Sequence, residues 1–262
     1  RRKGAEFTTK CDTEVLLYSY IFYGPQCVER LNGIFAFAVY DKAREMVFLA
    51  RDRLGVKPLF FSFAGTTLLF ASEIKALLKH PGVKSDVDML GLWQLVFLSP
   101  VRLNGVSVFR DIFELRPGFR AAYCKTGFQV QRYWKLSAEE FTDSRETAIE
   151  KTKWLITDAV KRQLVSDVPL CTLLSGGIDS SIVSSVAARD YGERGLTLST
   201  YSFEYEGNKE SFKSSLFQPQ GDDEYALYMA DFIGSEHRVL TAPTEKVADY
   251  LLNATIARDM PG

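Results

Sequence analysis

One segment is the most informative for the fold of the second half of the chain: Leu170-Cys171-Thr172-Leu173-Leu174-Ser175-Gly176-Gly177-Ile178-Asp179-Ser180-Ser181. It joins an apolar, β-type run to a run from Ile182 to Arg189 that suits a helix. Two adjacent glycines allow the backbone to turn sharply and to approach a ligand closely. This order of strand, glycine turn and helix predicts a binding loop at the carboxyl end of a strand in an α/β sheet.

The side chains of this loop favour an anion. Three serines, Ser175, Ser180 and Ser181, offer hydroxyl groups beside the N–H groups of a new helix N-terminus, and such donor clusters suit pyrophosphate. The loop holds no lysine, so it is not a Walker A loop. The structural alternative is an ordinary βα turn with Ser175 or Asp179 as helix N-cap. We favour the phosphate site because a buried-type strand precedes the loop and an apolar helix face follows it.

Several stretches together resemble one family. The Ser-Gly-Gly-x-Asp-Ser-Ser loop is similar to the pyrophosphate loop of N-type ATP pyrophosphatases, and Ser166-Asp167-Val168-Pro169 narrows the resemblance to the glutamine-hydrolysing asparagine synthetases. Three upstream stretches resemble core segments of that family's glutaminase domain: residues 31–41, 50–59 and 71–77. The matches cover nearly the whole chain and follow the family's order.

The resemblance implies two domains of different fold class, α+β followed by α/β. Residues 1–136 would be the C-terminal part of a glutamine amidotransferase domain of the N-terminal nucleophile type, with stacked antiparallel sheets. Residues 137–145 read as a polar linker, and residues 146–262 would begin a parallel-sheet ATP pyrophosphatase domain of the adenine nucleotide alpha hydrolase type. Family members start with a cysteine nucleophile and carry a later Ser-Gly-Glu-Gly-type loop, so we expect a fragment that lacks both ends and is inactive by itself.

Hydrophobic periodicity predicts the elements. In the first part we expect helices over 13–23 and 86–97, with strands over 34–39, 46–50, 59–63, 68–71, 106–109, 119–124 and 128–133, the first four forming two hairpins. In the second part we expect helices over 144–164, 180–190, 223–233 and 244–258, alternating with strands over 170–174, 197–203 and 236–240. Such alternation implies parallel pairing through right-handed crossovers. The polar insert 206–221 stays unassigned.

Bulk composition sets limits on function. The 262 residues are 46% hydrophobic and carry a formal net charge of −1, which gives no global reason to expect nucleic acid or membrane partners. No apolar run reaches the length of about 18 residues that a membrane helix needs. The four cysteines show no C-x-x-C spacing, which argues against zinc and against a disulfide framework. We interpret Cys171 as a core residue, and His80 and His237 as surface or core residues.

The resemblance also implies a chemistry. ATP and Mg²⁺ would convert aspartate to a β-aspartyl-adenylate, and ammonia from glutamine hydrolysis would then displace AMP. The positions that match the ATP and pyrophosphate site of the family are Leu173, Ser175, Gly176, Gly177, Asp179, Ser180, Ser181 and Phe203. Asp12 matches the carboxylate that holds the ammonium group of glutamine. Core packing is the alternative for Leu173 and Phe203, and a helix start is the alternative for Asp12. The nucleophile is not expected in this chain, and the metal ligands are unknown.

Two rival functions stay open. β-Lactam synthetases and lasso-peptide cyclases resemble the same family and adenylate a different acid. A non-catalytic scaffold would keep only the fold. We favour the synthetase, with aspartate, glutamine and ATP as small-molecule partners, a cytoplasmic location, and a homodimer as the working expectation for an oligomeric state that the sequence does not fix.

Overall fold

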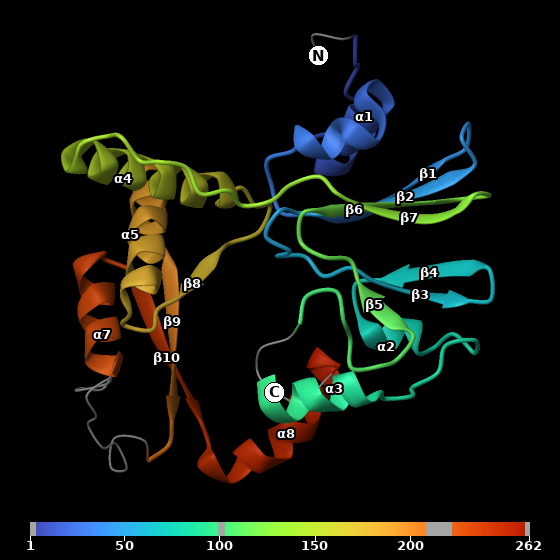
Figure 1. The fold of residues 1–262 in the computed structure, drawn as a ribbon. Helices are drawn as coiled ribbons and strands as arrows, with labels where there is room; N and C mark the ends of the chain where they lie inside the picture. The colour runs from blue at the N-terminus through green and yellow to red at the C-terminus, as the bar shows by residue number, and fades with distance from the viewer. Residues whose placement is uncertain (1–3, 99–102, 208–221, 260–262) are drawn as a thin grey trace. The chain divides into compact units, whose positions relative to one another are not determined.

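The computed structural model describes residues 4–98, 103–207 and 222–259 (Figure 1). The chain divides into two compact units, Arg1–Ala138 with Asn253–Gly262, and Glu139–Leu252. Each unit has its own core, so each is described by itself.

The first unit is built on two antiparallel sheets. One has the strand order β1-β2-β6-β7 and the other β4-β3-β5. The strands are β1 (Ala36–Asp41), β2 (Met46–Arg51), β3 (Phe60–Ala64), β4 (Thr67–Ala71), β5 (Ile112–Glu114), β6 (Phe119–Cys124) and β7 (Gly127–Arg132). The helical elements are α1 (Asp12–Tyr23), the 3₁₀ segment η1 (Gly24–Glu29), α2 (Ile74–Leu77), α3 (Met89–Trp93) and the π-helical turn η2 (Gln94–Leu98).

Alternation along β2 explains how these elements are layered. Successive side chains of a strand point to opposite faces. Leu49 faces the second sheet and shares a buried cluster with Phe61 of β3, in that sheet, and with Ala121 of the neighbouring strand β6. Phe48 and Ala50 point the other way and pack against α1 and η1. A strand buried on both faces therefore marks the middle of a layered core.

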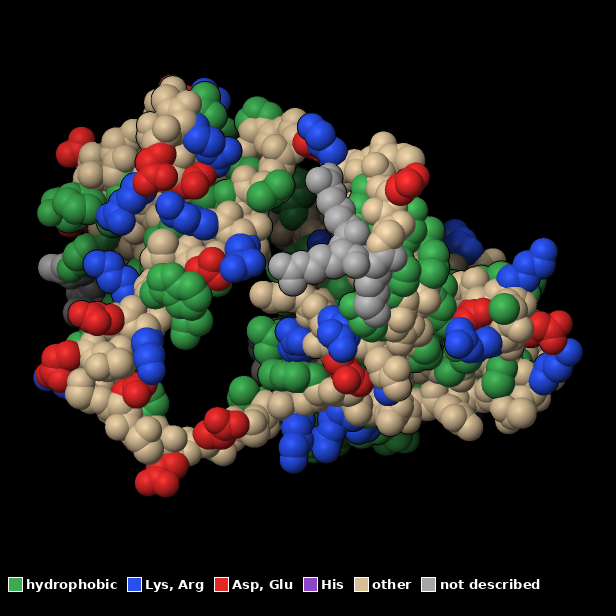
Figure 2. Space-filling view, turned by 90° about the horizontal axis from the view of Figure 1, so that it is seen from above, with side chains coloured by type: hydrophobic (Ala, Val, Ile, Leu, Met, Phe, Trp, Pro, Cys, Tyr) green, Lys and Arg blue, Asp and Glu red, His purple; other side chains and the backbone are tan. Residues whose placement is uncertain are grey.

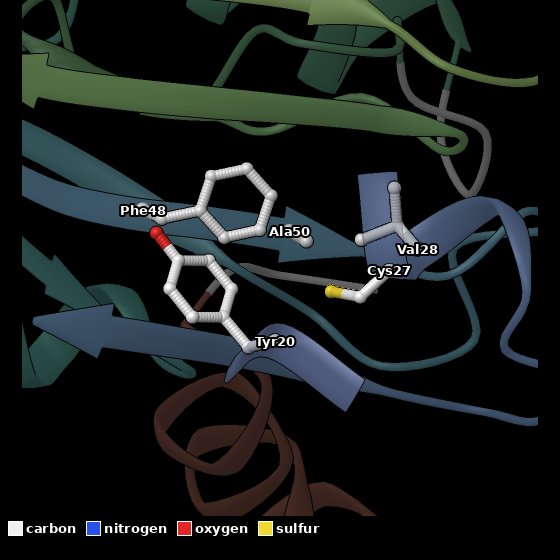
Figure 3. Packing of buried hydrophobic residues seen from close by; sticks show 5 residues of the cluster. All are labelled: Tyr20, Cys27, Val28, Phe48 and Ala50. Carbon is white, nitrogen blue, oxygen red and sulfur yellow. The ribbon is translucent and has the colours of Figure 1, made fainter. Parts of the chain in front are cut away.

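Helices cover the outer faces of both sheets. On one side, Tyr20 of α1 and two residues of η1 meet β2, as Figure 3 shows for Tyr20, Cys27, Val28, Phe48 and Ala50. On the other side, Ile74 and Leu77 of α2 pack on Phe60 and Ile112. The first unit is thus a helix–sheet–sheet–helix sandwich.

The second unit holds a parallel sheet of order β10-β9-β8. Its elements are α4 (Arg145–Gln163), β8 (Cys171–Leu173), α5 (Ile178–Glu193), β9 (Ser199–Tyr205), α7 (Asp222–Phe232), β10 (Glu236–Ala242) and α8 (Thr244–Arg258), whose last residues belong to the first unit. Leu174 packs on Ala226 and Ala230 of α7, while Thr172 contacts Ser184 of α5. Because Thr172 and Leu174 lie two residues apart, α5 and α7 cover the same face of the sheet.

The predicted fold class is confirmed: stacked antiparallel sheets are followed by a parallel sheet. The two hairpins are confirmed, one in each antiparallel sheet. The prediction of one helix over 86–97 is wrong at its start, which is an extended bridge from Val87 to Phe109, and at its end, which is the turn η2. The strand expected over 106–109 is reduced to two isolated bridges, and β5 was not predicted. Most of the insert 206–221 lies outside the described residues.

Candidate functional site

The loop between β8 and α5 has the backbone geometry of a ligand-binding turn. Gly176 adopts φ +81°, a region that costs little only for glycine. Gly177 is the N-cap of α5, in an extended conformation and without a side-chain cap. The alternative that Ser175 or Asp179 caps the helix is therefore wrong: Ser175 precedes the helix and Asp179 lies in its first turn. Helix geometry leaves the N–H groups of that turn without intrahelical acceptors.

Hydroxyl contacts hold the loop in a defined shape. Ser180 Oγ accepts from Ser175 N at 3.2 Å, lies 3.0 Å from Ser175 Oγ, and donates to Gly177 O at 3.1 Å. Ser175, Gly177 and Asp179 are exposed. The structure thus brings Ser175, Gly177 and Ser180 together and leaves this end of the loop open to solvent.

Leu173 and Phe203 lie on the open face of the parallel sheet. Leu173 pairs with Tyr201 of β9, and Phe203 is two residues further along the same strand. The core-packing alternative is not supported in the described chain, because both side chains are 63% exposed. The prediction that Cys171 is a core residue is wrong for the same reason: it lies on this face and is exposed. All four cysteines are free.

Asp12 lines a cavity of the first unit with a volume of about 680 Å³. Its walls come from four segments distant in sequence: Asp12 and Thr13 with Val15 and Leu16, residues 31–37, Lys57 with Pro58, and Ser72. Asp12 and Lys57 are the two charged side chains among the lining residues that the structure describes. Asp12 is also the first residue of α1, after the N-cap Cys11. A carboxylate there is favourable for the helix, so the structural role is present alongside any binding role.

Glu14, which sequence reasoning missed, holds the backbone just before Asp12. Its carboxylate accepts from Thr8 N at 2.9 Å and from Thr9 N at 2.7 Å, and it also accepts from both threonine hydroxyls. These hydrogen bonds, with the Thr8 N–H contributing most, lower the pKa of Glu14 to about 2. The spacing Thr-Thr-x-x-x-x-Glu ahead of an apolar helix was the available signal.

A buried charged turn leads into Lys57 and Pro58, which line the cavity. Asp52 accepts from the N–H groups of Leu54, Val56 and Lys57 at 3.0–3.1 Å. Arg51 donates to the carbonyls of Gly55, Lys57 and Leu115, and it pairs with Glu114 at 2.8 Å. Arg51 and Asp52 are 6% and 2% exposed. These contacts give the turn a structural role, and the residues that it positions are Lys57 and Pro58.

The candidate site shows no preformed metal cage. Within residues 4–98, 103–207 and 222–259, no three His, Cys, Asp or Glu side chains gather as metal ligands. Asp179 is the acidic side chain of the loop itself. In the same described ranges, no helix combines the length and apolar character that crossing a bilayer requires.

Comparison with known proteins gives a separate family match for each of the two parts of the chain. Residues 1–134 match the family described as "Glutamine amidotransferase domain", and residues 151–262 match "Asparagine synthase". The chain is 44% identical to asparagine synthetase [glutamine-hydrolyzing] 3 of Bacillus subtilis over 100% of its own length and 43% of that protein. It is 34% identical to a putative asparagine synthetase of Methanocaldococcus jannaschii, over 77% of this chain and 39% of the relative. Amidase chyE of Penicillium rubens is 28% identical over 98% of this chain and 38% of the relative.

A sandwich of antiparallel sheets with this match defines a glutamine amidotransferase domain, and the parallel sheet that follows in the sequence belongs to the part that matches the synthase family. Taken together, the two matches show that the chain belongs to the family of glutamine-hydrolysing asparagine synthetases. It spans less than half the length of the relatives named above.

Proposed function

We propose that the whole protein converts aspartate to asparagine, using ATP and ammonia released from glutamine. The observation that carries the proposal is the partly exposed Ser-Gly-Gly-Ile-Asp-Ser-Ser loop at the carboxyl end of a parallel strand. Support comes from the 44% identity to a glutamine-hydrolysing asparagine synthetase along the entire chain.

The loop fits the departing pyrophosphate. A carboxylate is a poor electrophile, and adenylation turns the side-chain carboxylate of aspartate into an acyl donor when its oxygen bonds to the α-phosphorus and pyrophosphate leaves. Ammonia then attacks the acyl carbon and AMP leaves. Charge develops on the pyrophosphate, and the first-turn N–H groups of α5 with Ser175 and Ser180 can stabilise it without proton transfer. Ser181 and Gly176 complete the proposed loop.

Leu173 and Phe203 would contact the adenosine part. Their exposed positions on the open face of the sheet support this assignment. Both are strand residues, so their backbone groups are fixed by pairing and the exposed side chains are free for the ligand.

Mg²⁺ is part of the proposal on chemical grounds. Asp179 places a carboxylate beside the phosphate site, where like charges would repel unless a cation lies between them. Mg²⁺ is commonly bound by one or two carboxylates together with phosphate oxygens. A single loop carboxylate suits that mode, and the ion would supply further charge neutralisation.

Asp12 would hold the ammonium group of glutamine in the cavity of the first unit. We propose residues 1–136 as the glutaminase part, 137–145 as the linker and 146–262 as the synthetase part. The family matches at 1–134 and 151–262 support this division. A cytoplasmic location is supported by the four free cysteines, which suit a reducing compartment. A homodimer is also part of the proposal, and light scattering of the whole protein tests it.

ATP–pyrophosphate exchange on the whole protein tests the function. Exchange that depends on aspartate is the expected result, with asparagine formed when glutamine or ammonia is added. Exchange that depends on another acid would favour the β-lactam synthetase or peptide-cyclase alternative. If no acid supports exchange, the non-catalytic scaffold is the alternative that remains.

A further inference from the structure

A polar network crosses the helix-covered face of the parallel sheet. Thr200 of β9 is fully buried at 0% exposure. Its Oγ1 lies 2.9 Å from Ser235 Oγ and 2.9 Å from Nδ1 of His237. Nε2 of the same imidazole lies 3.0 Å from Ser202 Oγ. The ring of His237 thus bridges two hydroxyl groups of one strand.

The strand register explains this bridge. His237 of β10 pairs with Thr200 of β9, and Ser202 is two residues further along. Side chains two apart on a strand share a face, so both hydroxyls lie on the side of the ring. The imidazole therefore runs along β9 toward its carboxyl end, where Phe203 follows Ser202 directly.

The network fixes the positions of the two strands relative to each other, at some cost to the stability of the fold. Thr200 is buried, and Ser202, Ser235 and His237 are partly buried. Hydroxyl and imidazole groups removed from water are unfavourable unless each is hydrogen-bonded, and apolar side chains could fill the same space. Here both ring nitrogens have partners, and Ser235 also donates to Ala230 O at the end of α7. Burial lowers the pKa of His237, which favours the neutral ring with one donor and one acceptor nitrogen. A fully satisfied network of this kind specifies one arrangement of the strands.

We propose that His237 is a positioning residue of the nucleotide site, which fixes the carboxyl half of β9 by bridging Thr200 and Ser202 and so sets the position of Phe203. This inference rests on the proposed function, because it takes Phe203 to lie against the adenine. The contact of His237 with Ser202 acts on the site through a single peptide bond, whereas its contact with Thr200, which also contacts Ser235, holds the core.

Two substitutions separate the two ends of the ring. The amide of a glutamine reaches the place of Nε2, so His237→Gln keeps the contact with Ser202. The shorter amide in His237→Asn matches Nδ1 and keeps the contact with Thr200. We expect His237→Asn to weaken ATP binding about fivefold, the loss of one hydrogen bond, and Ser202→Ala to do the same. His237→Gln should stay within about twofold of the unaltered protein.

The measurement is the Kd of ATP for the whole protein by calorimetry, together with the KM values of ATP and aspartate in pyrophosphate exchange. The double variant with Ser202→Ala and His237→Asn should bind ATP no more weakly than either single variant, since each substitution removes the same contact between the two side chains. Ser235→Ala is the matched control: it removes the other partner of Thr200, and it should lower Tm without changing the Kd. In each Ser202 and His237 variant that folds, the KM of aspartate should stay unchanged.

Equal Kd values for His237→Asn and His237→Gln would overturn the positioning role, as would an equal loss in Ser235→Ala. If the unaltered protein binds ATP but shows no aspartate-dependent exchange, the proposed function fails while the Kd comparison still decides this inference. If the unaltered protein binds no ATP, both fail.

Discussion

At the scale of single residues, Gly176 is where the loop depends most on the absence of a side chain. Its φ of +81° is unfavourable for residues with a Cβ. We expect Gly176→Ala to lower the free energy of unfolding by about 1 kcal/mol. Urea unfolding with circular dichroism measures this change.

Gly192, in the helix that follows this loop, is the matched control. It lies inside α5, and a Cβ there would meet open space. Gly192→Ala should therefore raise the free energy of unfolding by about 0.5–1 kcal/mol. Changes of the same sign in both variants would contradict the backbone conformation assigned to Gly176.

Glu14 supplies a pH-dependent contact beside Asp12. Hydrogen bonds from Thr8 and Thr9 lower its pKa to about 2, below the 4.5 of a free glutamate. A lowered folded pKa means that the contact stabilises the fold above pH 4.5 and loses this effect as the pH falls toward 2. NMR titration of the Glu14 carboxyl carbon should give a midpoint near pH 2, with the Thr9 amide shifting in parallel. In Glu14→Gln, the Thr9 amide should show no such titration; if it still does, another group is responsible.

At the scale of elements, the buried turn after β2 joins the two antiparallel sheets. Arg51 ends β2 and binds Glu114 and Leu115 at the end of β5 and just beyond it. Lysine cannot reproduce the planar fork of five donors, so Arg51→Lys leaves buried carbonyls without partners. We expect a loss of about 2–3 kcal/mol in the free energy of unfolding, measured in urea.

Arg44 is the control for this substitution. It pairs with Asp41 at 2.6 Å, but its side chain is 62% exposed, and exposed ion pairs contribute little. Arg44→Lys should leave the urea midpoint unchanged. An Arg51→Lys protein as stable as Arg44→Lys would show that the turn does not hold the sheets.

The elements that the sequence predicted best are those with a long, regular pattern. The helix over 244–258 and the strand over 119–124 have the predicted bounds, and β2 and β4 differ by one residue at an end. Strand β5 was missed because three residues are too few to show alternation. The apolar run near Trp93 has a helical period, yet its π-helical turn breaks that period at Gln94.

The same contrast holds for the two candidate sites. The loop at Ser175 is local, since strand, glycines and helix follow one another, and its shape could be predicted. The cavity at Asp12 gathers segments up to 60 residues apart along the chain, from Asp12 to Ser72. No local sequence pattern predicts that Lys57 lines the same cavity as Asp12, because this depends on the packing of two sheets.

At the scale of the whole molecule, the two units divide the proposed reaction. Each has its own buried clusters, and the two family matches are separated by residues 135–150. Basic and acidic side chains intermingle over the face shown in Figure 2, consistent with a net charge of −1.

This division predicts that each candidate site can be disabled separately in the whole protein. Asp12→Asn removes the negative charge that would hold the ammonium group of glutamine, while every residue of the nucleotide loop stays in place. We expect asparagine formation from glutamine to fall by at least about tenfold, because a charge-assisted hydrogen bond contributes about 1.5–3 kcal/mol. Formation from added ammonium should stay as in the unaltered protein.

Ser180→Ala should give a different result, because the hydroxyl of Ser180 contacts Ser175 and Gly177 inside the proposed pyrophosphate site. Asparagine formation should fall with both nitrogen donors, since both pathways need the same adenylate. Glutamate release from glutamine should persist. Chromatographic assay gives the three rates: asparagine formed from glutamine, asparagine formed from ammonium, and glutamate released from glutamine. If Asp12→Asn lowered the ammonium-dependent rate as much as the glutamine-dependent one, Asp12 would serve the fold of the first unit and not the binding of glutamine.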